Sequence, residues 1–219
     1  MMKRTMRTML GLALAVSGLL ILSLLSLSVQ AQLRLPPVPQ RGTPRGNQSP
    51  GTRRPENPCP AIAQPLSAIN ANNGSDFTAE ASPTFVFYVP YRAEAVDSLE
   101  FLLLDGQERR TLYRTEVTPA AAPGLVTVSI PEDTVLMTDS LYRWYLKLDC
   151  TGSEAESPYV VVDGWVQRIA PGEETAWYDE VSDRALTLIA APQDPQAQAD
   201  WQTLLDTLGL NNLSPAYKE

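Results

Sequence analysis

The segment that most constrains the fold is LYRWYLKLDC, residues 141–150, because its side chains alternate between two kinds along its whole length. One set is Tyr142, Trp144, Leu146, Leu148 and Cys150; the other is Leu141, Arg143, Tyr145, Lys147 and Asp149. A period of two with one apolar and one mostly polar face is typical of a half-buried antiparallel strand. We therefore predict that this segment is the central strand of a β-sandwich, with Trp144 in the core.

Further strands are predicted on either side of this segment, separated by proline, glycine and aspartate turn signals. They span 84–89, 98–104, 111–117, 125–130 and 159–169, and a seventh strand forms if residues near Phe77 pair. Gly164 indicates a bulge or a close backbone approach. Tyr142 sits where a tyrosine corner would bond back to the upstream backbone. The predicted fold is mostly β: an immunoglobulin- or fibronectin-like antiparallel sandwich over 58–170.

Two C-terminal α-helices are predicted in the remaining segment, 171–219. Trp177, Val181, Ala185 and Leu188 recur at a spacing of three to four within 173–191, which begins with acidic residues. Asp194 followed by Pro195 is typical of a second helix start. The second apolar stripe contains Trp201, Leu204, Leu205 and Leu208, and Gly209 suits the end of the helix. We expect both helices to pack on the sandwich or on a partner.

The chain has only two cysteines, Cys59 and Cys150. In an exported protein the simplest arrangement is a disulfide between them. It would tie the start of the folded domain to the end of the central strand.

Residues 1–31 are predicted to be a signal peptide. Lys3, Arg4 and Arg7 precede an uncharged apolar run from 9 to 29, and Ala31 is suited to signal-peptidase cleavage. The run is also close to the length of about 20 residues that spans a bilayer. We expect export to the periplasm or cell surface, with an inner-membrane anchor formed by an uncleaved segment as the alternative.

Residues 32–57 are predicted to be a disordered linker, because they are rich in proline, glycine and arginine. This segment has five basic residues and one acidic residue, whereas 58–219 has nine basic and 24 acidic residues, a net charge of −15. Two interpretations remain open: a solvated tether, or a basic arm that docks onto an anionic envelope surface. Nucleic acid is not an expected partner of so acidic a domain.

The chain contains no histidine, which removes the commonest general base and the commonest transition-metal ligand. We find no phosphate-binding loop, serine-hydrolase elbow or zinc pattern. Asp149, Glu154, Glu156 and Asp163 match no calcium loop and are interpreted as hydrated acidic positions. We therefore expect no metal, no cofactor and no catalytic activity, and a hydrolase that uses two carboxylates is the least favoured alternative.

Two groups of residues are candidates for binding. Trp165 with Gln167 and Arg168 could stack on a sugar and hydrogen-bond to it, or Trp165 could be a core residue. Trp177, Tyr178 and Asp179 could form a binding edge, or could pack the helix on the sheet.

Several separated motifs resemble one family. They are Gly51-Thr52-Arg53, Cys59-Pro60, Pro83-Thr84-Phe85, Tyr88-Val89-Pro90, Tyr142-Arg143-Trp144-Tyr145 with Cys150, Gly164-Trp165-Val166-Gln167-Arg168, Trp177-Tyr178-Asp179, and Asp200-Trp201 with Leu204-Leu205. In this order they resemble the cyanobacterial "domain of unknown function 928" family, from about residue 40 to the C-terminus. The resemblance implies an exported cyanobacterial protein and brings no activity or functional residues with it.

The functional expectation is an exported, non-catalytic envelope protein that binds another envelope protein. The alternative is a carbohydrate-binding module for cell-wall or extracellular polysaccharide, acting through Trp165 or Trp177. Membrane contact is expected only through the signal segment, if it stays uncleaved.

Overall fold

The structure is a computed structural model that describes residues 59–71, 75–152, 160–173 and 175–213, all of which belong to the compact unit Leu33–Glu219. The predicted signal peptide (1–31) and linker (32–57), and Glu154 and Glu156, lie outside the described residues.

The larger sheet has five strands in the order β2-β8-β7-β4-β5. They are β2 (Ser75–Thr78), β8 (Val160–Arg168), β7 (Leu141–Cys150), β4 (Val96–Asp105) and β5 (Thr111–Glu116). The strand β7 is central and pairs antiparallel with β8 and β4. The prediction from its alternation is confirmed.

The smaller sheet consists of β1 (Ser67–Ala68), β3 (Thr84–Val89) and β6 (Gly124–Ser129), all antiparallel. The two sheets face each other across a core of aromatic and aliphatic residues. Its largest members include Phe85, Phe87, Phe101 and Trp144. The described chain is thus mostly β, with two sheets as predicted.

Two details differ from the predicted antiparallel sandwich. The strand β2 pairs in parallel with β8, so the larger sheet is mixed. The two-residue strand β1 was not predicted. Segments of four and two residues carry too little alternation to specify a partner or a direction, which are set by where the chain crosses between the sheets.

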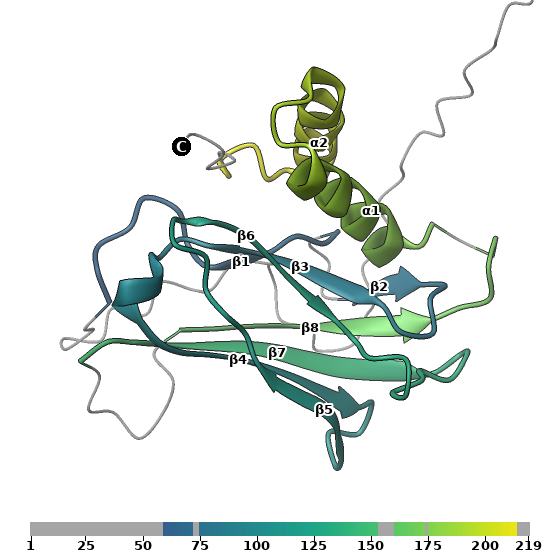
Figure 1. The fold of residues 1–219 in the computed structure, drawn as a ribbon. Helices are drawn as coiled ribbons and strands as arrows, with labels where there is room; N and C mark the ends of the chain where they lie inside the picture. The colour runs from purple at the N-terminus through teal and green to yellow at the C-terminus, as the bar shows by residue number, and fades with distance from the viewer. Residues whose placement is uncertain (1–58, 72–74, 153–159, 174, 214–219) are drawn as a thin grey trace, which may run out of the picture. The chain divides into compact units, whose positions relative to one another are not determined.

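The helices α1 (Trp177–Ala190) and α2 (Pro195–Leu208) cover the outer side of the smaller sheet (Figure 1). Their apolar stripes form a second core with Val86 and Tyr88 of β3. Asp194 accepts hydrogen bonds from the N–H groups of the first turn of α2, and Gly209 ends the helix with φ 70°, as predicted.

The helix α1 begins at Trp177, four residues later than the predicted start at Glu173. The backbone is not yet helical at the N-cap residue Ala176, which has φ −80° and ψ 85°.

The disulfide between Cys59 and Cys150 is present, with the two Cα atoms 5.2 Å apart. Both cysteines are buried in the main core. The prediction from cysteine number is confirmed, and the bond joins the first described residue to the end of the central strand.

Tyr142 accepts a hydrogen bond at 2.7 Å from the backbone N–H of Met137, five residues upstream. This is the kind of contact expected of a tyrosine corner. The closer assignment to an immunoglobulin- or fibronectin-like fold stays a prediction.

Trp144 is fully buried, and its ring lies against the backbone of Gly164 on β8, its register partner. A Cβ added to Gly164 would lie 2.4 Å from a ring carbon of Trp144. Gly164 therefore marks a close approach, one of the two alternatives predicted for it.

We expect Gly164→Ala to lower the free energy of unfolding by about 1–3 kcal/mol, because the added methyl group overpacks the core against Trp144. Urea unfolding measures the change. The matched control is Gly124→Ala on β6, where the nearest atom to the new Cβ is 3.8 Å away. That change should be neutral or gain up to about 1 kcal/mol. Equal effects at both positions would contradict this account of the core.

Candidate functional site

The outer side of the larger sheet carries the first candidate surface, the Trp165 face, defined as Arg143, Tyr145, Asp163, Trp165 and Gln167. Strand register places Arg143 beside Trp165 and Tyr145 beside Asp163. The same alternation that turns Trp144 inward turns these side chains outward. The helices bury their apolar stripes on the other sheet, so they leave this face open.

Arg143 organises the Trp165 face. Its guanidinium carbon lies 4.8 Å from the ring centre of Trp165 and 5.1 Å from that of Tyr145, and the group pairs with Asp163. Only 7% of Arg143 is exposed, whereas both rings are half-buried. Stacking on two rings and pairing with a carboxylate fixes the cation and holds both rings in place.

Tyr145 is also fixed at its outer end, where its hydroxyl donates a hydrogen bond at 2.6 Å to Glu108. Burial is the main reason that the pKa of Tyr145 is raised, and the bond to Glu108 acts in the same direction. Tyr145 therefore stays protonated and donates to Glu108. The Trp165 face is a rigid aromatic surface with charged groups between its rings.

The structure separates Arg168 from Trp165 and Gln167. Arg168 is the last residue of β8, and its guanidinium donates a hydrogen bond to the backbone carbonyl of Leu136. It thus holds the connection between β6 and β7 and is not part of the Trp165 face.

Of the two interpretations given for Trp177 and Tyr178, the structure agrees with helix packing and not with a binding edge, because both rings are buried. Trp177 belongs to the core between the helices and the smaller sheet. Tyr178 belongs to the core between the sheets, where its hydroxyl accepts from Trp144 Nε1 at 2.5 Å and donates to the carbonyl of Trp165 at 3.1 Å. The first turn of α1 points these neighbouring rings into two different cores.

Asp179 joins α1 to the end of β2. Its carboxylate accepts hydrogen bonds from the hydroxyl of Thr78 at 2.5 Å and from the N–H of Ala79 at 2.8 Å. Burial raises the pKa of Asp179, the charges of Glu80 and Asp183 add to this, and the two hydrogen bonds oppose it. Asp179 therefore has a structural partner on the sheet.

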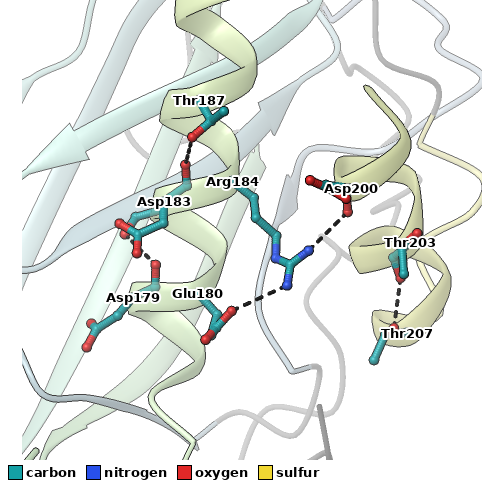
Figure 2. A network of polar contacts seen from close by, with 9 residues as sticks. Asp179, Glu180, Asp183, Arg184, Thr187, Asp200, Thr203 and Thr207 are labelled. Atoms are coloured by element: carbon teal, nitrogen blue, oxygen red, sulfur yellow. Dashed lines mark hydrogen bonds and ion pairs between the residues drawn. The ribbon is translucent and has the colours of Figure 1, made fainter. Parts of the chain in front are cut away.

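A second polar network joins the two helices. Figure 2 shows Arg184 of α1 between Glu180, at 3.5 Å, and the backbone carbonyl of Asp200 on α2, at 3.4 Å. Ion pairs that are this exposed add little stability. These contacts within the protein explain the position of the charged side chains, so no ligand is needed to explain it.

The second candidate surface is a groove of about 470 Å³ between the two sheets, which we call the β5–β6 groove. The strands β5 and β6 each end a sheet on this side (Figure 1). The lining residues are Tyr113, Thr115, Glu116, Val117, Thr118, Ala120, Leu125, Val126, Thr127, Val128, Ser129 and Ile189. The groove thus combines aliphatic side chains with hydroxyl groups and the carboxylate of Glu116.

A smaller hollow of about 260 Å³ adjoins the groove, sharing Glu116, Val117 and Thr118 with it. Asp97 and Glu116 are the carboxylates that line the two hollows, and both are exposed. The part of the chain that the structure describes holds no cluster of three or more side chains suited to a metal ion. Of the acidic positions considered for calcium, Asp163 pairs with Arg143, and Asp149 accepts a hydrogen bond from Ser98.

Sequence reasoning found Trp165 and Gln167 but missed the roles of Arg143 and Tyr145. The sequence did indicate these two positions, because the alternation along 141–150 places both side chains on the outer face of the strand. The β5–β6 groove had no such signal, since it depends on which strands end the sheets.

No helix among the described residues is both long enough and apolar enough to cross a membrane.

The fold and surfaces define a two-sheet β domain braced by two helices, with an aromatic sheet face and a groove at its open edges. The chain belongs to the family described as Domain of Unknown Function (DUF928), whose model matches residues 48–176. A search of curated proteins finds no match.

The family match begins before β1 and ends one residue before α1. It therefore includes the whole Trp165 face and both strands of the β5–β6 groove. Ile189, which α1 contributes to the groove, lies outside the matched region.

We expect Asp179→Asn to change how the free energy of unfolding depends on pH. A raised pKa means that the folded protein binds this proton more tightly than the unfolded chain, where the ordinary value is 3.8. The resulting stability is fully present below pH 3.8 and is lost as the pH rises through the raised pKa of the folded state. In urea unfolding, the wild type should lose stability relative to Asp179→Asn across this window.

The control is Asp133→Asn, at an exposed position between β6 and β7. Comparison with this variant separates the effect of the Asp179 site from the loss of one negative charge. A difference between the wild type and Asp179→Asn that stays constant with pH would contradict the assignment.

Proposed function

We propose that the protein is an exported, non-catalytic protein of a cyanobacterial cell envelope that acts as a protein-interaction module. Export is supported by the apolar N-terminal segment of the sequence and by the Cys59–Cys150 disulfide. The strongly acidic composition of 58–219 speaks against nucleic acid as the partner.

The observation that carries the proposal is the β5–β6 groove. Its walls are the edges of two sheets, and its lining combines apolar side chains with hydroxyls. Open sheet edges pair readily with a further polypeptide segment. The occupant that we assign to the groove is therefore an extended segment of another envelope protein.

The exposed carboxylates favour this function over a hydrolase. A glycosidase acid needs a partly desolvated carboxyl that faces a second one across the substrate. Asp97 and Glu116 are exposed at the rim of their hollows. They are better suited to attracting a basic partner.

We expect Ile189→Lys to abolish protein binding, because it puts a charge into the apolar wall of the groove. The matched control is Leu186→Lys, since both residues are 45% exposed on α1 and Ile189 lines the groove whereas Leu186 does not. The measurement is affinity capture by the tagged, oxidised full chain from envelope extract, with and without prior glycan digestion.

The wild type and Leu186→Lys should retain the same proteins in both extracts, and Ile189→Lys should lose them. Equal retention by all three chains would exclude the groove as the binding site. Retention that disappears after glycan digestion would favour a carbohydrate ligand.

The second candidate function, carbohydrate binding, is supported by the Trp165 face. A fixed aromatic ring offers a stacking surface for a sugar, and Asp163 and Gln167 lie beside it as hydrogen-bonding groups. The ligand would be a cell-wall or extracellular polysaccharide.

If this second function holds, Trp165→Ala should weaken retention on envelope polysaccharide by about tenfold, because the sugar loses its stacking surface. Tyr113→Ala is the control, because Tyr113 is a half-buried aromatic residue that lines the β5–β6 groove instead. Affinity electrophoresis measures retention, and circular dichroism checks folding. Unchanged retention of Trp165→Ala would exclude this function.

A further inference from the structure

The strand β6 is a sheet edge whose hydrogen-bonding groups can be assigned from its neighbours. One residue beyond the register pair Thr84 and Ser129, the N–H of Ile130 donates to the carbonyl of Pro83 at 3.0 Å. In an antiparallel ladder, every second residue directs its N–H and C=O toward the partner strand. Val126 and Val128 therefore bond to β3.

Leu125, Thr127 and Ser129 direct their backbone groups away from β3, toward the open side of the sheet. The opposite strand supports this assignment, since Val86, the register partner of Thr127, uses its carbonyl on the other side to accept from Ile69 at 2.9 Å. Within the described part of the chain, no other strand pairs with β6. Three N–H groups and three C=O groups are thus presented along this edge.

The edge of β6 lacks the features that usually block strand addition. Its sequence, GLVTVS, contains no charged residue and no proline, and its register with β3 is unbroken. Lysines, prolines and bulges are the common protections of exposed edges. By contrast, β5 carries Arg114 and Glu116 and has an irregular register with β4.

The charges around the groove indicate what kind of segment fits. Asp97 and Glu116 line the two adjoining hollows, and no described lining residue is basic. Residues 58–219 carry a net charge of −15. The acidic part of a second copy, 58–219, would be repelled by this charge, whereas a neutral or basic segment would not.

We propose that one extended, neutral or basic segment of a partner protein binds in the β5–β6 groove by pairing with β6 as an added strand. The inference rests on the proposed function and specifies its mode of recognition and the chemistry of its partner. Backbone hydrogen bonds to Leu125, Thr127 and Ser129 give the affinity. Side chains on one side of the added strand contact Ile189, and those on the other contact Tyr113.

The test uses the full-length protein and a short fluorescent peptide of alternating valine and threonine between terminal lysines. Fluorescence anisotropy measures binding at low and at high salt. We expect saturable binding that weakens with salt, and binding about tenfold weaker when the peptide amides that face β6 are N-methylated. An otherwise identical peptide with terminal glutamates should also bind more weakly.

The variant Thr127→Pro removes an N–H group that faces the open edge and leaves the ladder to β3 intact, a position where proline is tolerated. It should weaken binding about tenfold. Thr127→Ala loses the same side chain but keeps the N–H, so it should weaken binding much less than Thr127→Pro does. Arg114→Pro alters the edge of β5 and should also leave binding unchanged. Thermal unfolding confirms that each variant is folded.

Absence of saturable binding, or equal binding by Thr127→Pro and the wild type, overturns strand addition. Loss of binding in Arg114→Pro alone would assign the segment to β5 and also overturns it. If sedimentation shows a wild-type dimer that Thr127→Pro dissociates, the occupant is a second copy. The proposed function fails separately, when the wild-type chain retains no envelope protein in the capture experiment.

Discussion

The burial of one indole ring, that of Trp144, determines how the rest of the domain is arranged. The ring occupies the space that a side chain at residue 164 would need, so β8 must have a glycine opposite it. Its only polar atom, Nε1, donates to Tyr178, which in turn donates to the carbonyl of Trp165. A buried indole N–H without a partner would be costly. The central strand is thereby joined to its neighbouring strand and to the first turn of α1.

The inward orientation of Trp144 determines which surfaces of the domain remain available for binding. With Trp144 inside, alternation places Arg143 and Tyr145 outside, and the register brings Trp165 of β8 beside them. Arg143 is then nearly buried between two rings that stay half-exposed. The helices occupy the outer side of the smaller sheet, so the open surfaces are the Trp165 face and the groove between β5 and β6.

The parts of this arrangement that depend on local sequence patterns could be predicted from the sequence. Alternation identified β7 and its buried face, the presence of two cysteines identified the disulfide, and Asp194 with Pro195 identified the start of α2. Patterns of this kind do not specify the partner or direction of β2, which pairs in parallel. They also do not tell an exposed tryptophan from a buried one. The strand register places Trp165 half-buried on the outer face of the larger sheet, whereas the packing of α1 places Trp177 in a core. The groove depends on which strands end the sheets, a property of the whole topology.

An open, uncharged edge such as that of β6 is ordinarily a risk, because like edges pair and aggregate. The protection in this chain lies elsewhere, in the acidity of the domain as a whole. A net charge of −15 over 58–219 opposes the approach of a second copy at long range, without placing a charged residue on β6 itself. Charged residues, prolines or bulges on β6 itself would hinder pairing with every polypeptide. Long-range repulsion hinders pairing only with acidic ones. In the proposed mode of binding, the backbone groups of Leu125, Thr127 and Ser129, which pair with no other strand in the described part of the chain, would accept a neutral or basic segment, and the acidity that opposes a second domain would favour such a partner.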